Sequence, residues 1–180
     1  MAFDVVKSSL THKGKIVEVY NDEITLPNGG KAHWELVKRG NAAAVVPVDE
    51  NNMVTLVRQY RHGAKKKILE IPAGMLNPGE DPVTCAKREL EEETGLVAGS
   101  LYKLMDYYVS AGFCDEIMYI YLASDFTGGT LKPDPEEFIE IEKFHMDDAV
   151  KMTQNGEIID SKTICGILAA KEYLSTKFYP

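Results

Sequence analysis

The sequence predicts an α/β protein in which a mixed β-sheet lies between α-helices, preceded by N-terminal antiparallel strands. Two observations support this prediction. Short β-type runs separated by turn residues fill the first third of the chain, and helix signals mark Pro82–Thr94 and Ser161–Leu174 further on. Strands followed by mixed strands and helices are typical of a layered α/β domain.

The N-terminal third is expected to form hairpins. Pro27–Gly30, with the sequence PNGG, and Asp49–Asn52, with the sequence DENN, are turn signals between β-type runs. The runs predicted to be strands are Lys15–Tyr20, Asp22–Leu26, Lys31–Lys38, Ala42–Val48 and Val54–Tyr60.

The helix at Pro82–Thr94 has the clearest boundary signals. Asp81 can cap its start, a proline fits its first turn, and Gly95 stands where the chain leaves the helix. Later strands are expected at Leu104–Val109, Ile117–Ala123 and Glu137–Phe144. Later helices are expected at Met146–Gln154, where Asp147 is the start signal, and at Ser161–Leu174.

The composition limits the classes of protein that fit. With 180 residues, 44% of them hydrophobic and 27% charged, the chain has the size and make-up of one soluble domain. A net charge of −8 argues against nucleic-acid binding, because Lys and Arg must neutralise phosphates. No apolar run reaches the ~18 residues of a membrane span. Three cysteines without a C-x-x-C pair suit a reducing compartment. We therefore expect a cytoplasmic protein with neither membrane nor nucleic acid as partner.

Three carboxylates are expected on one face of the Pro82–Thr94 helix. Glu89, Glu92 and Glu93 are three and four residues apart and so project together. They repel one another, and Arg88 can offset only part of that repulsion. Mg²⁺ prefers carboxylate oxygens and bridges to substrate phosphates, and the Ala73 carbonyl in the preceding loop can join it. A solvated acidic helix face is the alternative reading of the run taken alone.

The segment Gly74–Leu96 resembles the Nudix box, G-x5-E-x7-R-E-U-x-E-E-x-G-U, where U is aliphatic. Every defined position is matched, by Gly74, Glu80, Arg88, Glu89, Leu90, Glu92, Glu93, Gly95 and Leu96. The resemblance implies a Nudix fold and a Nudix hydrolase whose loop–helix–loop carries the catalytic metal. Mg²⁺ is the expected ion, with Mn²⁺ as a substitute.

The same resemblance implies roles within the box. Glu89 and Glu93 are the expected main metal ligands, together with Ala73, and Glu92 is an additional one. Arg88 would brace the loop and helix, as would Glu80.

Segments outside the box resemble the ADP-ribose pyrophosphatases of the family. They are His33–Arg39 (HWELVKR), Val57–Arg61 (VRQYR), Glu70–Gly74 (EIPAG), Glu136–Ile141 (EEFIEI) and Gly156–Thr163 (GEIIDSKT). The resemblance implies hydrolysis of the pyrophosphate bond of a nucleoside diphosphate sugar, with ADP-ribose favoured. The products would be a nucleoside monophosphate and a sugar phosphate.

The subfamily resemblance also implies contacts with the substrate. Trp34 would stack on the nucleobase, and Glu35 would accept a hydrogen bond from it. Arg39 and Arg61 would hold phosphate or ribose oxygens, because a guanidinium matches phosphate geometry.

The general base is expected in the acidic loop, at Glu137, where it can take a proton from water. Glu137, Glu92 and Arg88 then form the expected catalytic set. Glu136, Glu140 and Glu116 remain alternatives for the base.

The resemblance further implies a homodimer. Residues 1–40 would form N-terminal strands that serve dimerisation, and residues 41–180 would form the Nudix hydrolase domain. GDP-mannose or a dinucleotide polyphosphate is an alternative substrate, because stacking discriminates poorly between bases. A non-catalytic module that binds ADP-ribose and regulates a partner is the alternative of another class, and the intact set of carboxylates argues against it.

Overall fold

A computed structural model of the chain describes residues 2–132 and 138–177. The chain divides into two compact units. The first comprises the chain up to Asn41 together with Tyr107–Met118, and the second comprises Ala42–Asp106 together with the chain from Tyr119 onward. The inclusion of Tyr107–Met118 in the first unit had no signal in the sequence.

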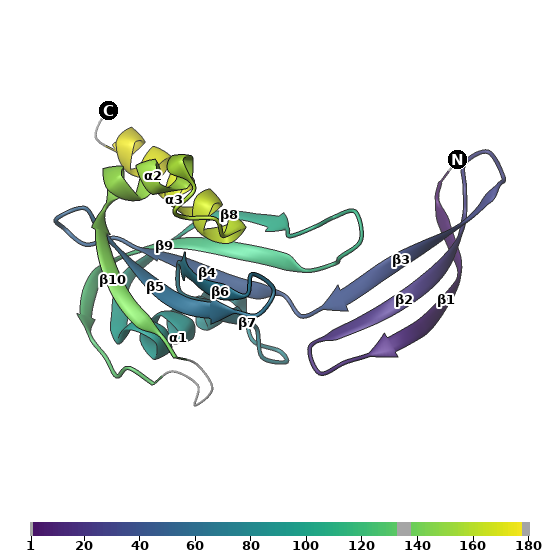
Figure 1. The fold of residues 1–180 in the computed structure, drawn as a ribbon, viewed down its shortest axis with the longest axis horizontal. Coiled ribbons are helices and arrows are strands. Elements are labelled where there is room, and N and C mark those ends of the chain that lie inside the picture. Colours follow the sequence, from purple (N-terminus) through teal and green to yellow (C-terminus); the bar gives the residue numbers. More distant parts are fainter. Residues whose placement is uncertain (1, 133–137, 178–180) are drawn as a thin grey trace. The chain divides into compact units, whose positions relative to one another are not determined.

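The first unit contains an antiparallel sheet of three strands in the order β1-β2-β3 (Figure 1). Its strands are β1 (Asp4–Lys13), β2 (Val17–Thr25) and β3 (Lys31–Arg39). Strand β1 was not predicted, and β2 runs without a break through two predicted shorter strands. Every residue of β1 except the half-buried Ser9 is exposed, so this strand buries little of its own surface.

The end of β3 is fixed by the loop that joins β8 to β9. Val37 N donates to Phe113 O at 2.7 Å, and Asp115 N donates to Val37 O at 3.2 Å. Ile117 N donates to Asn41 Oδ1 at 2.9 Å. These bonds explain why a segment distant in sequence belongs to the first unit.

The second unit contains two sheets, ordered β7-β4-β9-β8 and β10-β5-β6. Their strands are β4 (Ala42–Pro47), β5 (Met53–Arg61), β6 (Lys66–Glu70), β7 (Ala73–Met75), β8 (Leu96–Tyr108), β9 (Ile117–Gly128) and β10 (Glu140–His145). Strands β6 and β7 were not predicted, and β8 begins at Leu96 rather than at the predicted Leu104. Among the described residues β10 begins at Glu140, and Glu137 lies outside them.

The helices among the described residues are α1 (Pro82–Thr94), α2 (Met146–Asn155) and α3 (Ser161–Lys177). The predicted bounds of α1 are confirmed, because Asp81 Oδ1 accepts from Val83 N and Thr84 N, and Gly95 ends the helix at φ 70°. The predicted start of α2 at Met146 is confirmed, but the residue that caps the helix is His145 and not Asp147. The Nδ1 of His145 accepts from Asp147 N.

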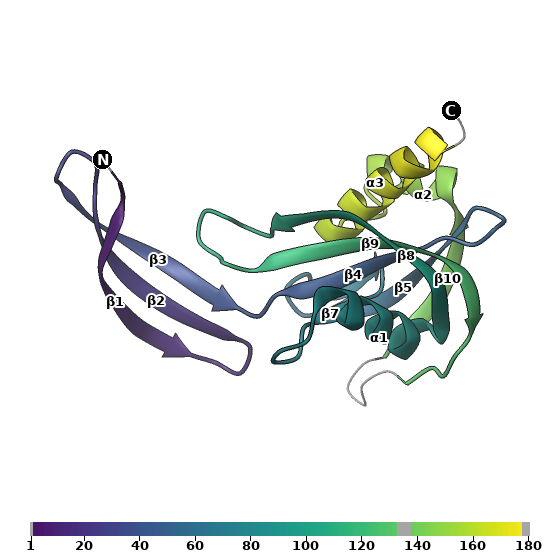
Figure 2. The same ribbon diagram turned by 180° about the vertical axis from the view of Figure 1, so that it is seen from behind.

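Strand β4 is buried along its whole length between helices. Figures 1 and 2 show α1 on one side of the β4 sheet and α2 with α3 on the other. Ala43 and Val45 pack with Leu90 of α1. On the other face a Cβ at Gly166 of α3 would lie 2.9 Å from Val46 Cγ2, so glycine allows α3 to approach the sheet closely. No helix in the described ranges is long and apolar enough to cross a membrane.

Candidate active site

Arg88 of α1 holds together the loop before the helix and the acidic face of the helix. Its Nε and Nη2 both donate to Glu80, each at 2.9 Å. Its Nη1 donates to Glu89 at 2.5 Å and to Glu92 at 3.0 Å, and its Nη2 donates to the Met75 carbonyl at 3.1 Å. We call Arg88, Glu80, Glu89 and Glu92 the Arg88 cluster. Its single cation leaves an excess of negative charge.

The loop before α1 lies directly against the carboxylates of the helix. A Cβ added at Gly74 would lie 2.0 Å from Glu89 Oε1, so only glycine lets this carboxylate reach the loop backbone. Ala73 N donates to Glu93 Oε2 at 3.3 Å, and Glu93 is 2% exposed. The structure therefore brings together Ala73, Glu89 and Glu93, the three residues predicted to bind metal.

A second group of charges surrounds the buried Glu70 at the end of β6. Arg61 Nε and Nη2 donate to its two oxygens at 2.7 and 2.6 Å, and Lys162 Nζ donates to Oε2 at 2.6 Å. Lys162 also donates to Asp160 at 3.0 Å. We call Glu70, Arg61, Lys162 and Asp160 the Glu70 cluster. Burial acts to raise the pKa of Glu70, but the bonds and charges of Arg61 and Lys162 outweigh it and hold that pKa below its usual value.

The roles of Glu70 and Lys162 were missed at the sequence level. Both lie in segments that resembled the subfamily, but their pairing spans 92 residues of the chain. One signal was available. A glutamate inside the apolar run Ile68–Ile71 is expected to be buried, and a buried carboxylate needs a cation.

Three predicted substrate-binding residues lie on β3 in the first unit. Trp34 is 49% exposed and touches Phe3, with 5.6 Å between ring centroids. Glu35 is also exposed. Successive side chains alternate along a strand, so Trp34 faces the opposite side of the sheet from Glu35 and Arg39. A ligand would meet all three only along the edge of the sheet, and β3 is an edge strand of that sheet.

Arg39 is anchored inside the first unit. Its backbone N donates to Asp115 Oδ1 at 3.0 Å and its Nη1 donates to Glu116 Oε2 at 2.9 Å. The buried Nε of Arg39 has no hydrogen-bond partner within the part of the chain that the structure describes.

Of the four candidates for the general base, Glu116 and Glu140 lie among the described residues. Glu136 and Glu137 lie outside the described residues. Glu116 is 3% exposed and engaged with Arg39. Glu140 is exposed on β10 and paired with Lys67, whose hydrogen bond lowers the pKa of Glu140.

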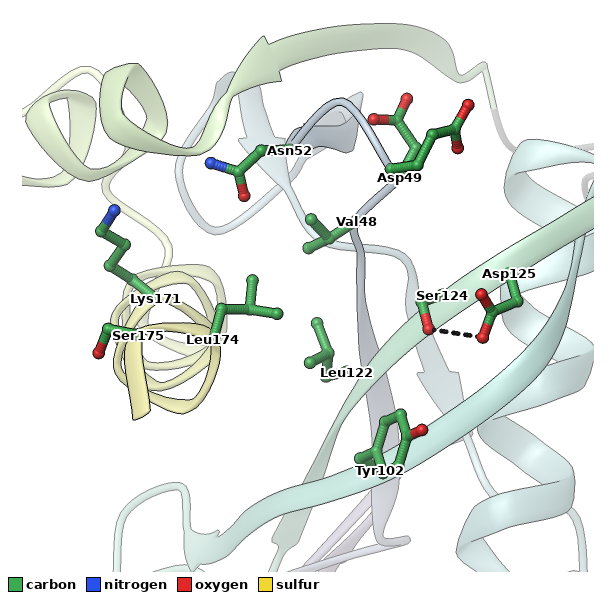
Figure 3. Close-up of a pocket in the computed structure, with 11 residues that line it drawn as sticks. Val48, Asp49, Asn52, Tyr102, Leu122, Ser124, Asp125, Lys171, Leu174 and Ser175 are labelled. Atoms are coloured by element: carbon green, nitrogen blue, oxygen red, sulfur yellow. Dashed lines mark hydrogen bonds between the residues drawn. The ribbon is translucent and has the colours of Figure 1, made fainter. Parts of the chain in front are cut away.

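A cavity of about 510 Å³ lies elsewhere in the second unit, beside the C-terminal half of α3 (Figure 3). Val48, Leu122 and Leu174 line its apolar part, and Asp49 and Asp125 are among its polar residues. None of the residues predicted to bind metal or substrate lines this cavity, so it is separate from the two charged clusters.

Comparison with known proteins identifies the family. A model of the NUDIX domain matches residues 38–165. The chain belongs to the Nudix family. It is 39% identical to an ADP-ribose pyrophosphatase of Bacillus subtilis (strain 168), over 91% of this chain and 88% of the relative. It is 35% identical to a methanol dehydrogenase activator of Bacillus methanolicus, over 90% of this chain and 89% of that one.

A crystal structure of an ADP compounds hydrolase matches the fold of this Nudix protein. The TM-score is 0.88 at 20% sequence identity, over 98% of this chain and 96% of that chain. The predicted Nudix fold is thereby confirmed, with a mixed sheet, N-terminal antiparallel strands and three helices. The protein is a Nudix pyrophosphohydrolase, and Gly74–Leu96 is its Nudix box.

Nudix hydrolases typically use a divalent metal, and the residues of this box fit one. Glu89 and Glu93 supply hard oxygen donors on one helix face, and Gly74 lets the loop come close to them. In residues 2–132 and 138–177 no three His, Cys, Asp or Glu side chains form a ready-made metal group. Glu89 and Glu92 instead turn toward Arg88, so we expect ion binding to exchange part of the Arg88 contacts for metal contacts.

Proposed function

We propose that this Nudix enzyme hydrolyses the pyrophosphate bond of a nucleoside diphosphate sugar, with ADP-ribose as the favoured substrate. The observation that carries the proposal is the close packing of the Ala73–Gly74 loop against Glu89 and Glu93. The similarity to the ADP-ribose pyrophosphatase of Bacillus subtilis supports the choice of substrate.

Each residue has a part in the proposed reaction. Glu89, Glu93 and the Ala73 carbonyl would hold Mg²⁺, or Mn²⁺ in its place, with Glu92 as an additional ligand. When bound, the ion would neutralise charge on the diphosphate and acidify a water. Arg88 would keep the helix and loop in register through its contact with Glu80.

Side chains from several segments would hold the substrate. Arg61 and Arg39 would bind phosphate or ribose oxygens, since a guanidinium donates in a fork that matches phosphate. Trp34 would stack on the base and Glu35 would accept a hydrogen bond from it. Glu137 would take a proton from the attacking water as the P–O bond breaks in line.

A homodimer is part of the proposal. Large apolar side chains are exposed on the first unit, at Phe3, Val5, Val6, Leu10, Ile16 and Trp34. Exposed apolar surface of this kind marks interaction sites, and a second copy of the chain would cover it. Sedimentation at micromolar concentration should give twice the 20.0 kDa mass of one chain, and a species of one chain's mass would refute the dimer.

Product analysis tests the reaction. The purified protein is incubated with ADP-ribose and Mg²⁺ in ¹⁸O-labelled water, and we expect AMP and ribose 5-phosphate, one of them labelled. The labelled product identifies the phosphorus that is attacked. A panel including GDP-mannose and a dinucleotide polyphosphate, compared by kcat/KM, ranks the substrates. Binding of ADP-ribose without cleavage in Mg²⁺ or Mn²⁺ would favour a regulatory module instead.

The base assignment needs its own test. Glu137→Gln should slow turnover while metal and substrate binding stay near the parent values. Full activity of this variant would move the role to Glu136, Glu140 or Glu116.

A further inference from the structure

The N-terminus of α3 meets the end of β6 at one buried carboxylate. Glu70 is 1% exposed, and it accepts two hydrogen bonds from Arg61 and one from Lys162. The Lys162 side chain is 11% exposed, whereas that of Arg61 is 40% exposed. Two cations, one of them shielded from water, therefore share one carboxylate.

The four charges of the Glu70 cluster balance, because Arg61 and Lys162 meet Glu70 and Asp160. Lys162 meets Glu70 from the inner side, so Arg61 does not have to neutralise this buried carboxylate alone. Arg61 contributes Nε and Nη2 to Glu70, and its Nη1 has no hydrogen-bond partner within the described ranges of the chain. The hydrogen bond to Glu70 raises the pKa of Arg61, and the charges of Glu93 of α1 and of Asp160 also act to raise it.

The N-terminal end of α3 also holds the segment that joins β6 to Ala73. Ile71 N donates to Thr163 Oγ1 at 2.9 Å, and Thr163 Oγ1 donates to Asp160 Oδ2 at 2.6 Å. Asp160 Oδ2 accepts from Lys162 as well. Ile71 is two residues before Ala73, so the N-terminus of α3 positions both a phosphate-binding residue and a metal-binding residue.

We propose that Lys162 is a positioning residue for the diphosphate: it neutralises Glu70 so that Arg61 can direct its charge at the substrate. This inference rests on the proposed function, in which Arg61 binds phosphate oxygens. Lys162 itself touches no substrate. Without its charge, Glu70 would take up the whole charge of Arg61 and weaken its hold on the diphosphate.

The test compares lysine variants within α3. Lys162→Met should raise the KM for ADP-ribose roughly tenfold, the size expected for one uncompensated charge near a partly exposed phosphate site. The kcat and the Mg²⁺ concentration for half-maximal activity should stay within about twofold, because the metal ligands are untouched. Lys162→Arg restores the charge and should keep KM near the parent value. Lys171→Met is the matched control, since Lys171 pairs with the exposed Asp147 and should leave KM unchanged.

Lys162→Gln separates the effect of the lysine charge from the effect of its hydrogen bond to Glu70. It also replaces Lys162→Met in the test if that variant does not fold. Glutamine can still donate to Glu70, so a purely structural contact would be retained and KM would stay at the parent value. A raised KM in Lys162→Gln supports the proposal. An unchanged KM, or the same rise in Lys171→Met, overturns it.

A second measurement tests the role of Lys162 independently of which reaction the enzyme catalyses. Calorimetric binding of ADP in EDTA measures the hold on a diphosphate without metal or turnover. Weaker binding by Lys162→Gln than by Lys171→Met supports the role of Lys162 even if the parent does not cleave ADP-ribose. Equal binding overturns it, whatever the enzyme hydrolyses.

Discussion

The Arg88 cluster and the Glu70 cluster, both in the second unit, differ in their balance of charge. In the Arg88 cluster one guanidinium meets three carboxylates. In the Glu70 cluster two cations meet two carboxylates, Glu70 and Asp160. An excess of carboxylate suits a cation, and a guanidinium in a balanced cluster suits phosphate oxygens. We infer from this difference that the two proposed tasks, holding the metal and holding the diphosphate, are separable and that substitutions can affect them independently.

The largest effect is expected at the proposed metal-binding face of α1. Glu93→Gln removes the charge of a carboxylate that is 2% exposed and keeps its shape. We expect kcat to fall at least about a hundredfold, the order that loss of one electrostatic stabiliser costs. Steady-state hydrolysis at saturating Mg²⁺ measures this. Glu91→Gln is the control on the same helix, because the Glu91 side chain accepts a hydrogen bond from Thr130 N. An equal loss of kcat in this variant would mean that damage to the helix caused the effect.

Gly74→Ala should disturb the metal without disturbing the diphosphate. The new Cβ would lie 2.0 Å from Glu89 Oε1, and the flexible carboxylate would have to move away from the loop. We expect the Mg²⁺ concentration for half-maximal activity to rise about 10- to 100-fold, as for other changes that misplace a metal ligand. Gly128→Ala is the control, because its Cβ meets nothing within 4 Å. A normal Mg²⁺ requirement in Gly74→Ala would argue that Glu89 is not a ligand.

Arg61→Lys should weaken the binding of the diphosphate without changing the Mg²⁺ requirement, the converse of Gly74→Ala. A lysine keeps the charge but cannot bind Glu70 and a phosphate with the same planar fork. We expect KM to rise roughly tenfold, an energy comparable to one charge-assisted hydrogen bond, while the Mg²⁺ requirement stays at the parent value. If Arg61→Lys and Gly74→Ala both change KM and Mg²⁺ requirement together, the two clusters act as one and the comparison fails.

Glu80→Gln should have the smallest effect, on stability and its pH dependence. Hydrogen bonds from Arg88 and from Asn77 N lower the pKa of Glu80 from 4.5 to about 2. A carboxyl with a lowered folded-state pKa stabilises above its unfolded pKa, and the contribution is lost as pH falls through the folded value. The urea midpoint of Glu80→Gln should therefore lie below that of the parent at pH 7. The gap should narrow between pH 4.5 and 2.

Glu172→Gln is the control for the Glu80 series. Glu172 is exposed on α3, and its variant should follow the parent at every pH. A gap between the Glu80→Gln variant and the parent that stays constant down to pH 2 would contradict the lowered pKa.

Local signals were sufficient for part of the fold. Helix α1 could be bounded from sequence because Asp81 and Gly95 act on the backbone next to them. Strand β1 gave no such signal, since nearly all of DVVKSSLTHK is exposed and carries no apolar alternation. The short strand β7 was expected to be loop, because only its pairing with Ala42–Ala44 of β4 makes it a strand.

The site followed the same rule. The box could be predicted because its spacing places Glu89 and Glu93 one helical turn apart, and the structure puts Gly74 beside Glu89 and Ala73 beside Glu93. The Glu70 cluster could not, because Lys162 reaches Glu70 only once α3 docks on the sheet. The predicted strand Lys31–Lys38 already contained Trp34 and Glu35, so the opposite directions of these two side chains followed from the sequence, whereas Arg39 lay just beyond its predicted end.

The position of Cys85 makes the catalytic loop observable in solution. Cys85 is fully buried, its Sγ donates to the Gly74 carbonyl at 3.5 Å, and burial raises its pKa to about 12. The thiolate is the form that attacks an alkylating reagent, so the half-buried Cys114 and Cys165 should be modified first. Cys85 should be labelled slowly, and only when the Gly74 loop moves away from α1. The rate at which maleimide modifies Cys85 therefore reports how often this loop opens.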